Sequence, residues 1–212
     1  MLSTDRLLAF AVTAFVVIVI PGPSVLFVVG RALASGRRVA VLTVVGNALG
    51  EYLQVIAVAF GVGALAERSV AAFTALKLVG GVYLVYLGVR TFRERRSLAA
   101  ALAAPVSERS DRRSFVQGFT VGATNPKTVV FLAAILPQFV SHAGGHVPAQ
   151  ILLLGLVFAA IALFSDTMWA LAAGWFRLWF ARSPRRLELI GGAGGLAIVA
   201  VGAGLLVSGR KD

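Results

Sequence analysis

The sequence contains no cysteine, and only 14% of its 212 residues are charged. Without thiols, the chain can form neither a disulfide framework nor a thiolate metal site. Its apolar fraction of 58% exceeds the roughly 45 to 50% of a soluble domain, and its charged fraction lies well below the roughly 25% found there. We therefore interpret the chain as an integral membrane protein.

The motifs of several enzyme classes are also missing. The sequence has no P-loop pattern, which argues against ATP-driven pumping, and no H-E-x-x-H pattern, which argues against a zinc protease of that type. The two histidines, His142 and His146, lie in a Gly-rich stretch with no acid nearby, so a metal site is not expected there. We expect no enzymatic activity and no cofactor.

Six apolar runs between charged connections predict six transmembrane helices, because roughly 20 apolar residues cross a bilayer as a helix. These runs are Leu7 to Ala34, Val39 to Leu65, Val70 to Phe92, Phe115 to Val140, Pro148 to Phe176 and Leu187 to Val207. The net charge of +11 could suggest nucleic acid, but the basic residues lie in short connections and not along one soluble face. We expect a lipid bilayer around this protein and no nucleic-acid partner.

The connections after the first, third and fifth runs contain 14 of the 20 lysines and arginines. The positive-inside rule therefore predicts that these connections are cytoplasmic and that both chain ends lie outside.

The longest charged connection, about 93–113, divides the chain into two halves of three runs each. Because three is odd, the second half must enter the membrane in the opposite direction, which is the inverted repeat of many secondary transporters. We predict one all-α membrane domain over residues 1–212, with repeats at about 5–92 and 114–208. The oligomeric state is open, with a homodimer as one option.

Prolines interrupt the first run near its centre, in the sequence Pro21-Gly22-Pro23-Ser24. Prolines have no N–H, so the carbonyls of Val17 and Val19 lose their helical partners and need donors from neighbouring protein or water. A new half-helix is expected to begin with Gly22 as cap and Pro23 in its first position, which leaves the amides of Ser24 and Val25 able to bind an anion. The alternative is a proline kink that only shapes helix packing.

The fourth run is interrupted in a similar way, at Asn125-Pro126-Lys127. Asn125 holds the favoured capping position and Pro126 the first helical one. Lys127 follows directly and could bind a carboxylate or pair with an intramembrane acid, whereas we expect Lys77 to extend its stem outward to the interface. We therefore predict broken helices in the first and fourth spans.

Polar residues recur on one helical face of the second run, at Thr43, Asn47, Glu51 and Gln54. Glu51 lies near mid-span, and Asp166 holds a similar place in the fifth run. A charged side chain at the centre of a lone helix costs about 2.5 to 3.5 kcal/mol, so both acids should face a cavity or a partner. We favour a functional role, with a structural ion pair or a protonated acid between helices as the alternative.

Glycines four residues apart, Gly46 and Gly50 in the second run and Gly118 and Gly122 in the fourth, predict close helix packing.

Together these motifs resemble those of the LysE/RhtB family of amino-acid exporters. The resemblance covers nearly the whole chain and rests on Pro21-Gly22-Pro23-Ser24, Gly36-Arg37, Gly46-x-x-x-Gly50-Glu51, Gly118, Asn125-Pro126-Lys127, Phe131, Pro137-Gln138-Phe139 and Asp166. Two positions depart from the family pattern. Many members have Asp in place of Glu51, and a polar amide or an acid often replaces Ser24.

The resemblance implies a secondary exporter that moves amino acids or closely related metabolites out of a bacterial cell across its inner membrane. Protons are the candidate coupling ion. We predict a substrate site formed by Pro21, Gly22, Pro23, Ser24, Asn47, Glu51, Asn125, Pro126, Lys127 and Asp166.

In this hypothesis the substrate carboxylate lies at the half-helix N-termini near Ser24 and Lys127, and its ammonium faces Glu51 or Asp166. An acid that takes a proton from outside would release the ammonium and so couple the two flows. The alternatives are an ion or metal-cation carrier that uses the same two acids, and a membrane subunit that transports nothing.

Overall fold

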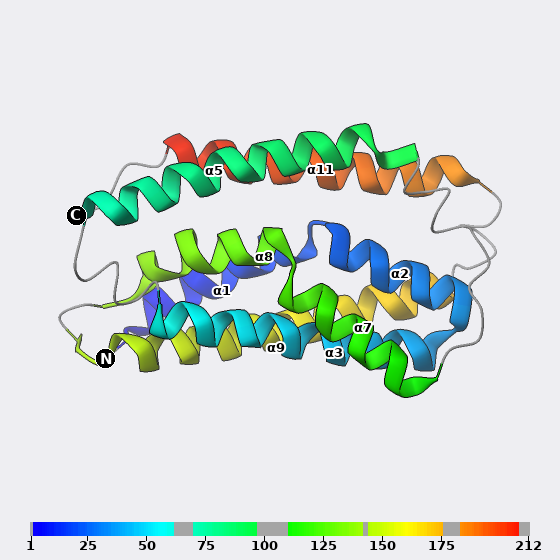
Figure 1. The fold of residues 1–212 in the computed structure, drawn as a ribbon, viewed down its shortest axis with the longest axis horizontal. Coiled ribbons are helices and arrows are strands. Elements are labelled where there is room, and N and C mark those ends of the chain that lie inside the picture. Colours follow the sequence, from blue (N-terminus) through cyan, green and yellow to red (C-terminus); the bar gives the residue numbers. More distant parts are fainter. Residues whose placement is uncertain (1, 62–69, 97–109, 142–143, 176–182, 208–212) are drawn as a thin grey trace.

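The computed structural model describes residues 2–61, 70–96, 110–141, 144–175 and 183–207 (Figure 1). Within these ranges every regular element is helical, and the principal helices are α1 (Thr4–Val19), α2 (Pro23–Ser35), α3 (Arg37–Phe60), α5 (Val70–Arg93), α7 (Asp111–Ala123), α8 (Pro126–Val130), α9 (Val147–Trp175) and α11 (Pro184–Val207). The predicted all-α fold is confirmed for this part of the chain. Most of the predicted linker at 93–113 lies outside the described residues, and its last residues, 111–113, already belong to α7.

Several helical segments are long and apolar enough to cross a membrane. Among the described residues they are Arg37–Phe60, Asp111–Phe139, Val147–Ala173 and Glu188–Val207. The bent pair formed by Thr4–Val19 and Pro23–Leu33 adds a fifth when it is counted as one broken span. The chain is therefore a multi-pass membrane protein. The third predicted run forms the 24-residue α5 but is not among these segments, so the six-span inverted repeat stays a prediction.

Both predicted breaks are present. The first lies between α1 and α2, with Gly22 as N-cap and Pro23 in the first turn of α2, and the two helices are bent by 54°. The second lies between α7 and α8, with Asn125 as N-cap and Pro126 in the first turn. The local chemistry of proline and of capping residues therefore places both breaks correctly.

Both breaks lie against a separate pair of helices, α5 and α11. α5 and α11 run side by side along most of their length (Figure 1), whereas α3 packs against α7 and α9 in the rest of the bundle. Gly80 of α5 lies close to the side chain of Val130 in α8, and Gly194 of α11 lies against the carbonyl of Pro21. The α5–α11 pair thus contacts both broken spans.

The backbones of α3 and α7 are in direct contact. A Cβ atom on Gly122 of α7 would lie 2.1 Å from the carbonyl oxygen of Asn47 in α3, so this position has no room for a side chain. A Cβ atom added at Gly46, Gly50 or Gly118 would likewise lie 2.1 to 2.2 Å from a carbonyl oxygen of the opposite helix. The predicted close packing is confirmed for these glycines, and it brings the second break close to the middle of α3.

The sequence pattern did not predict the irregular helix that follows α8. Residues Phe131–Ile135 form a π-helical turn and Leu136–Phe139 a 3₁₀ turn. Pro137 cannot donate to the carbonyl four residues earlier, so a regular α-helix cannot continue through it. The amide of Leu136 instead donates to the carbonyl of Phe131, five residues earlier. Phe131 stacks on Phe158 of α9 with ring centroids 5.3 Å apart, in the core that supports the second break.

Arginine-rich helix ends gather at one end of the bundle. The turn between α2 and α3, the end of α5 and the starts of α7 and α11 all lie at the right in Figure 1, whereas α1 begins and α11 ends at the left. At the right end Arg38 pairs with Asp111 at 2.6 Å, and Arg96 pairs with Glu188 at 3.6 Å. The grouping is the one that the positive-inside prediction requires, while the side that faces the cytoplasm stays a prediction.

Candidate functional site

The two predicted acids come together at the centre of the bundle. Asn47, Glu51 and Gln54 on α3 are buried, as the shared-face prediction requires, and Thr43 lies on the same buried face. Asp166 on α9 is also buried and lines the same small cavity as Glu51. Because α9 packs directly on α3, the acids of the second and fifth predicted spans form one polar cluster.

Glu51 is held by residues of the second break. Its Oε1 accepts hydrogen bonds from Thr128 Oγ1 at 3.1 Å and from Asn125 Nδ2 at 3.4 Å. Asn125 Nδ2 also donates to Ser24 Oγ at 3.1 Å, and Asn125 Oδ1 accepts from the Lys127 amide at 3.2 Å. One amide side chain therefore caps α8 and links it to α2 and α3.

The amides of α3 use their donors within the protein. Asn47 Nδ2 donates to Asp166 Oδ2 at 3.2 Å. Gln54 Nε2 donates to the carbonyl of Gly122 at 2.8 Å and to that of Asn125 at 3.4 Å. These bonds fix both side chains with their NH₂ groups toward protein acceptors.

Several side-chain oxygens on the same face of α3 have no hydrogen-bond partner among the described residues. In the described part of the chain, Asn47 Oδ1, Gln54 Oε1 and Glu51 Oε2 are buried and accept no hydrogen bond. Buried polar atoms are nearly always paired, so a group of three unpaired ones calls for a reason. All three are acceptors, so the face suits a ligand that carries hydrogen-bond donors, such as an ammonium group.

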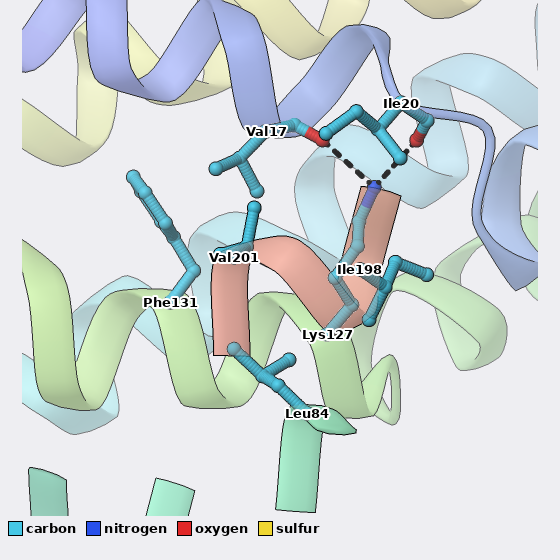
Figure 2. A pocket seen from close by; sticks show the side chains of 7 residues that line it. All are labelled: Val17, Ile20, Leu84, Lys127, Phe131, Ile198 and Val201. Atoms are coloured by element: carbon cyan, nitrogen blue, oxygen red, sulfur yellow. Dashed lines mark hydrogen bonds between the residues drawn. The ribbon is translucent and has the colours of Figure 1, made fainter. Parts of the chain in front are cut away.

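Lys127 directs its ammonium to the first break (Figure 2). Its Nζ donates to the carbonyl of Val17 at 3.1 Å and to that of Ile20 at 2.9 Å. These carbonyls lie at the C-terminal end of α1, where helical partners are missing and a positive charge is favoured. A Cβ atom on Gly22 would lie 3.2 Å from Nζ, so this glycine leaves room for the ammonium. Of the two carbonyls predicted to need donors, Val17 is bound by Lys127, whereas the second acceptor is Ile20 and not Val19.

Small cavities lie on both sides of Lys127. One is lined by Ser24, Glu51 and Asp166, and the other is apolar and faces α5 and α11 (Figure 2). Each has a volume of about 10 Å³, which is room for about one water molecule. The conformation is therefore closed around the polar cluster. Among the described residues, the Lys127 ammonium forms no ion pair with either acid.

The start of α2 differs from the start of α8. Ser24 is buried in the first turn of α2, and no side chain caps this helix. The first amides of a helix have no intrahelical acceptor, so those of Ser24 and Val25 are directed to whatever lies before the helix. Pro21 and Pro23 shape this break, and Pro126 occupies the matching place in α8.

The sequence did not single out Thr128, although its hydroxyl is a direct partner of Glu51. The signal was its position three residues after Asn125, which places both side chains on one face of α8.

The side chain of Lys77 and residue His142 lie outside what the structure describes. Within its described ranges the structure holds no group of three His, Asp or Glu side chains arranged for a metal ion.

Comparison with known proteins identifies the family. The chain matches the model of LysE type translocators over residues 15–209. It is 31% identical to a homoserine/homoserine lactone efflux protein of Salmonella typhimurium, over 95% of this chain and 96% of the relative. It is 35% identical to an uncharacterized membrane protein of Vibrio cholerae over 84% of each chain, and 26% identical to a leucine efflux protein of an Enterobacter species over 92% of each. No solved structure matches it.

The match spans both breaks and both buried acids, and two of these relatives are named as efflux proteins, which are transporters and not enzymes. The resemblance predicted from the sequence motifs is thus confirmed, and the chain is a transporter of the LysE type translocator family.

Proposed function

We propose that this protein is a proton-coupled secondary exporter of amino acids or closely related small metabolites. Membership of a translocator family supports transport, and two relatives are named for efflux of homoserine or its lactone and of leucine. The observation that carries the proposal is the set of buried, unpaired acceptor atoms on α3 beside Asp166. An amino group is the chemical feature that such substrates share, and it presents only donors when protonated.

The substrate ammonium would bind between α3 and α9. Glu51 Oε2 is a free acceptor, and Asp166 adds a second carboxylate to the cavity that Glu51 lines. Asn47 Oδ1 is another free acceptor on the same face of α3. A carboxylate oxygen that is buried without a partner is costly, so a bound ammonium would stabilise the cluster. Glu51 is the first candidate ligand because Thr128 and Asn125 orient it and use only one of its oxygens.

The substrate carboxylate would bind at the N-terminus of α2. This helix has 13 residues and no side-chain cap, so its first amides and its dipole favour an anion. Ser24 lines the cavity that also contains Glu51 and Asp166. A zwitterion could therefore bridge the start of α2 and the polar face of α3.

Protons would couple to export through the same acids. An acid that takes up a proton from outside no longer attracts the ammonium, so the substrate is released on that side. The cavities of about 10 Å³ leave no room for an amino acid, which supports a closed intermediate between conformations open to either side.

We further propose six spans in a bacterial cytoplasmic membrane, with the arginine-rich end inside and α5 as the third span. α5 runs along α11, and α3 packs on α9. These pairs join the third span to the sixth and the second to the fifth, as two inverted repeats related by a two-fold axis would require.

The direct test is efflux from proteoliposomes loaded with a mixed pool of labelled amino acids that includes homoserine and leucine. Efflux is measured with and without an imposed proton gradient, for the native protein, Glu51→Gln and Glu188→Gln. Glu188 lies at the bundle end, paired with Arg96, so it controls for the same acid-to-amide change. Gradient-driven efflux should fall about tenfold or more in Glu51→Gln, because a charged hydrogen bond to the substrate is lost, and should persist in Glu188→Gln.

Competition separates the substrate classes. The intact amino acid should compete, whereas its decarboxylated amine and its N-acetyl derivative should compete poorly, since each lacks one of the two charged groups. Undiminished efflux from Glu51→Gln would remove the proposed role of this acid. Competition by simple cations and not by amino acids would favour an ion carrier instead.

A further inference from the structure

Three charged side chains share the closed centre of the bundle. Asp166, Glu51 and Lys127 line one cavity and are 3%, 4% and 6% exposed. The polar side chains beside them, Ser24 and Thr128, are neutral, and the rest of the lining is apolar. Two carboxylates and one ammonium therefore leave one negative charge in excess.

Other elements around Lys127 bring no further charge to it within the described residues. The second cavity beside it is lined by Leu84 of α5 and Ile198 of α11, with other apolar side chains (Figure 2). Arg31 is another buried cation, but it lies seven residues beyond Ser24, which is about 10 Å along the α2 axis. It donates to Gln117 of α7, away from the acids.

The partners of Lys127 keep its charge in place while the acids change state. Its Nζ binds two backbone carbonyls, and carbonyls do not titrate. Its position therefore does not depend on whether Glu51 or Asp166 holds a proton. Gly22 is the residue that leaves space for this arrangement.

From this charge balance we propose that Lys127 sets how many protons the carrier must bind before it can reorient without substrate. With the Lys127 ammonium this number is one, and without it the number is two. The inference rests on the proposed exporter function. A net charge buried in a low-dielectric interior is costly, so the empty carrier should reorient only when its centre is neutral. With Lys127 charged, one proton shared by Glu51 and Asp166 is sufficient, and it belongs to the pair and not to either acid. Without that ammonium, both acids must be protonated.

The test compares Lys127→Arg, which keeps the charge, with Lys127→Gln, which keeps a hydrogen-bond donor without the charge. Net efflux of leucine or homoserine is measured in proteoliposomes with equal pH on both sides, at a series of alkaline pH values. Under these conditions each cycle waits for the empty carrier to take up its protons and return. The efflux rate should fall about tenfold per pH unit in the native protein and in Lys127→Arg, as one proton requires, and about a hundredfold per unit in Lys127→Gln, as two protons require. An equal pH dependence of efflux in Lys127→Gln and the native protein would overturn the proposal.

A second readout does not depend on transport. Folded Lys127→Gln should hold one proton more than the folded native protein, whereas the acids of the unfolded chain are ionised at neutral pH. Its stability in detergent should therefore decrease more steeply as pH rises, by the slope of one additional proton. Equal slopes would also overturn the proposal. If the native protein exports no amino acid of the mixed pool, the exporter function fails, yet this slope still decides the proton count.

A compensating variant guards against a misfolded Lys127→Gln. The double substitution Lys127→Gln with Asp166→Asn again leaves one excess negative charge, on Glu51. The free energy of unfolding of this double variant should depend on pH as steeply as that of the native protein. The conservative Lys127→Arg should also keep the native pH dependence. A double variant that keeps the steep slope or fails to fold would mean that charge balance is not what Lys127 supplies.

Discussion

The two helix breaks differ in how their backbone groups are satisfied. At the second break Asn125 caps α8 with its side-chain oxygen and donates to Glu51 and Ser24 through its NH₂ group. At the first break the N-cap is Gly22, and no side chain caps α2. The carbonyls that end α1 are bound by Lys127, which belongs to the other half of the chain.

Under the proposed function, we expect the second break to be structural and the first to bind substrate. The second break is capped by a side chain of the protein, so its side chains should matter first for stability and for the position of Glu51. At the first break Lys127 binds two carbonyls, but the amides that begin α2 receive no side-chain cap. Substitutions at the second break should therefore cost folding free energy, and those at the first should affect substrate binding more than folding.

The largest expected effect is that of Asn125→Ala. It removes a helix cap, worth about 1 kcal/mol, and a buried donor to a carboxylate, worth about 1.5 to 3 kcal/mol. We expect the free energy of unfolding to fall by about 3 kcal/mol, with loss of export. Unfolding in detergent, followed by circular dichroism, measures the change. Asn125→Asp is the matched variant, because it keeps the cap but places a second negative charge beside Glu51. A change below about 0.5 kcal/mol in Asn125→Ala would show that the second break is not held by this residue.

A smaller effect is expected from Gly122→Ala, which tests the packing that brings the second break to α3. The new Cβ would meet the Asn47 carbonyl oxygen at 2.1 Å, so the helices must move apart. Overpacking of this kind costs about 2 kcal/mol, and it should also weaken export, because Gln54 binds the Gly122 carbonyl. Gly204→Ala is the control, since a Cβ there meets nothing within 4 Å. Equal stability of the two variants would contradict the close α3–α7 contact.

Much of this fold could be predicted because its signals are local. Charged connections and apolar runs indicated the long helices, and the prolines with their capping residues indicated both breaks. The contacts of Lys127 could not be predicted, because the sequence does not show whether its long side chain reaches an acid, a substrate or the α1 carbonyls. The contact of Lys127 with α1 and the role of Thr128 depend on how segments about 75 to 110 residues apart pack together. The way in which distant helices are oriented against each other leaves no periodic signal in the sequence.

The smallest effect on stability is expected from Ser24→Ala, at the first break. Ser24 accepts one hydrogen bond, from Asn125, and that donor group keeps its contact with Glu51 when the hydroxyl is removed. The loss should therefore be under about 1 kcal/mol. If the backbone amides of α2 bind the substrate carboxylate, this variant should still export, with an apparent KM within about tenfold of the native value, because the substitution leaves every amide in place. Complete loss of export by a protein of native stability would instead assign carboxylate recognition to the hydroxyl, and the first break would then resemble the second, with a side chain and not the open helix start as its binding group.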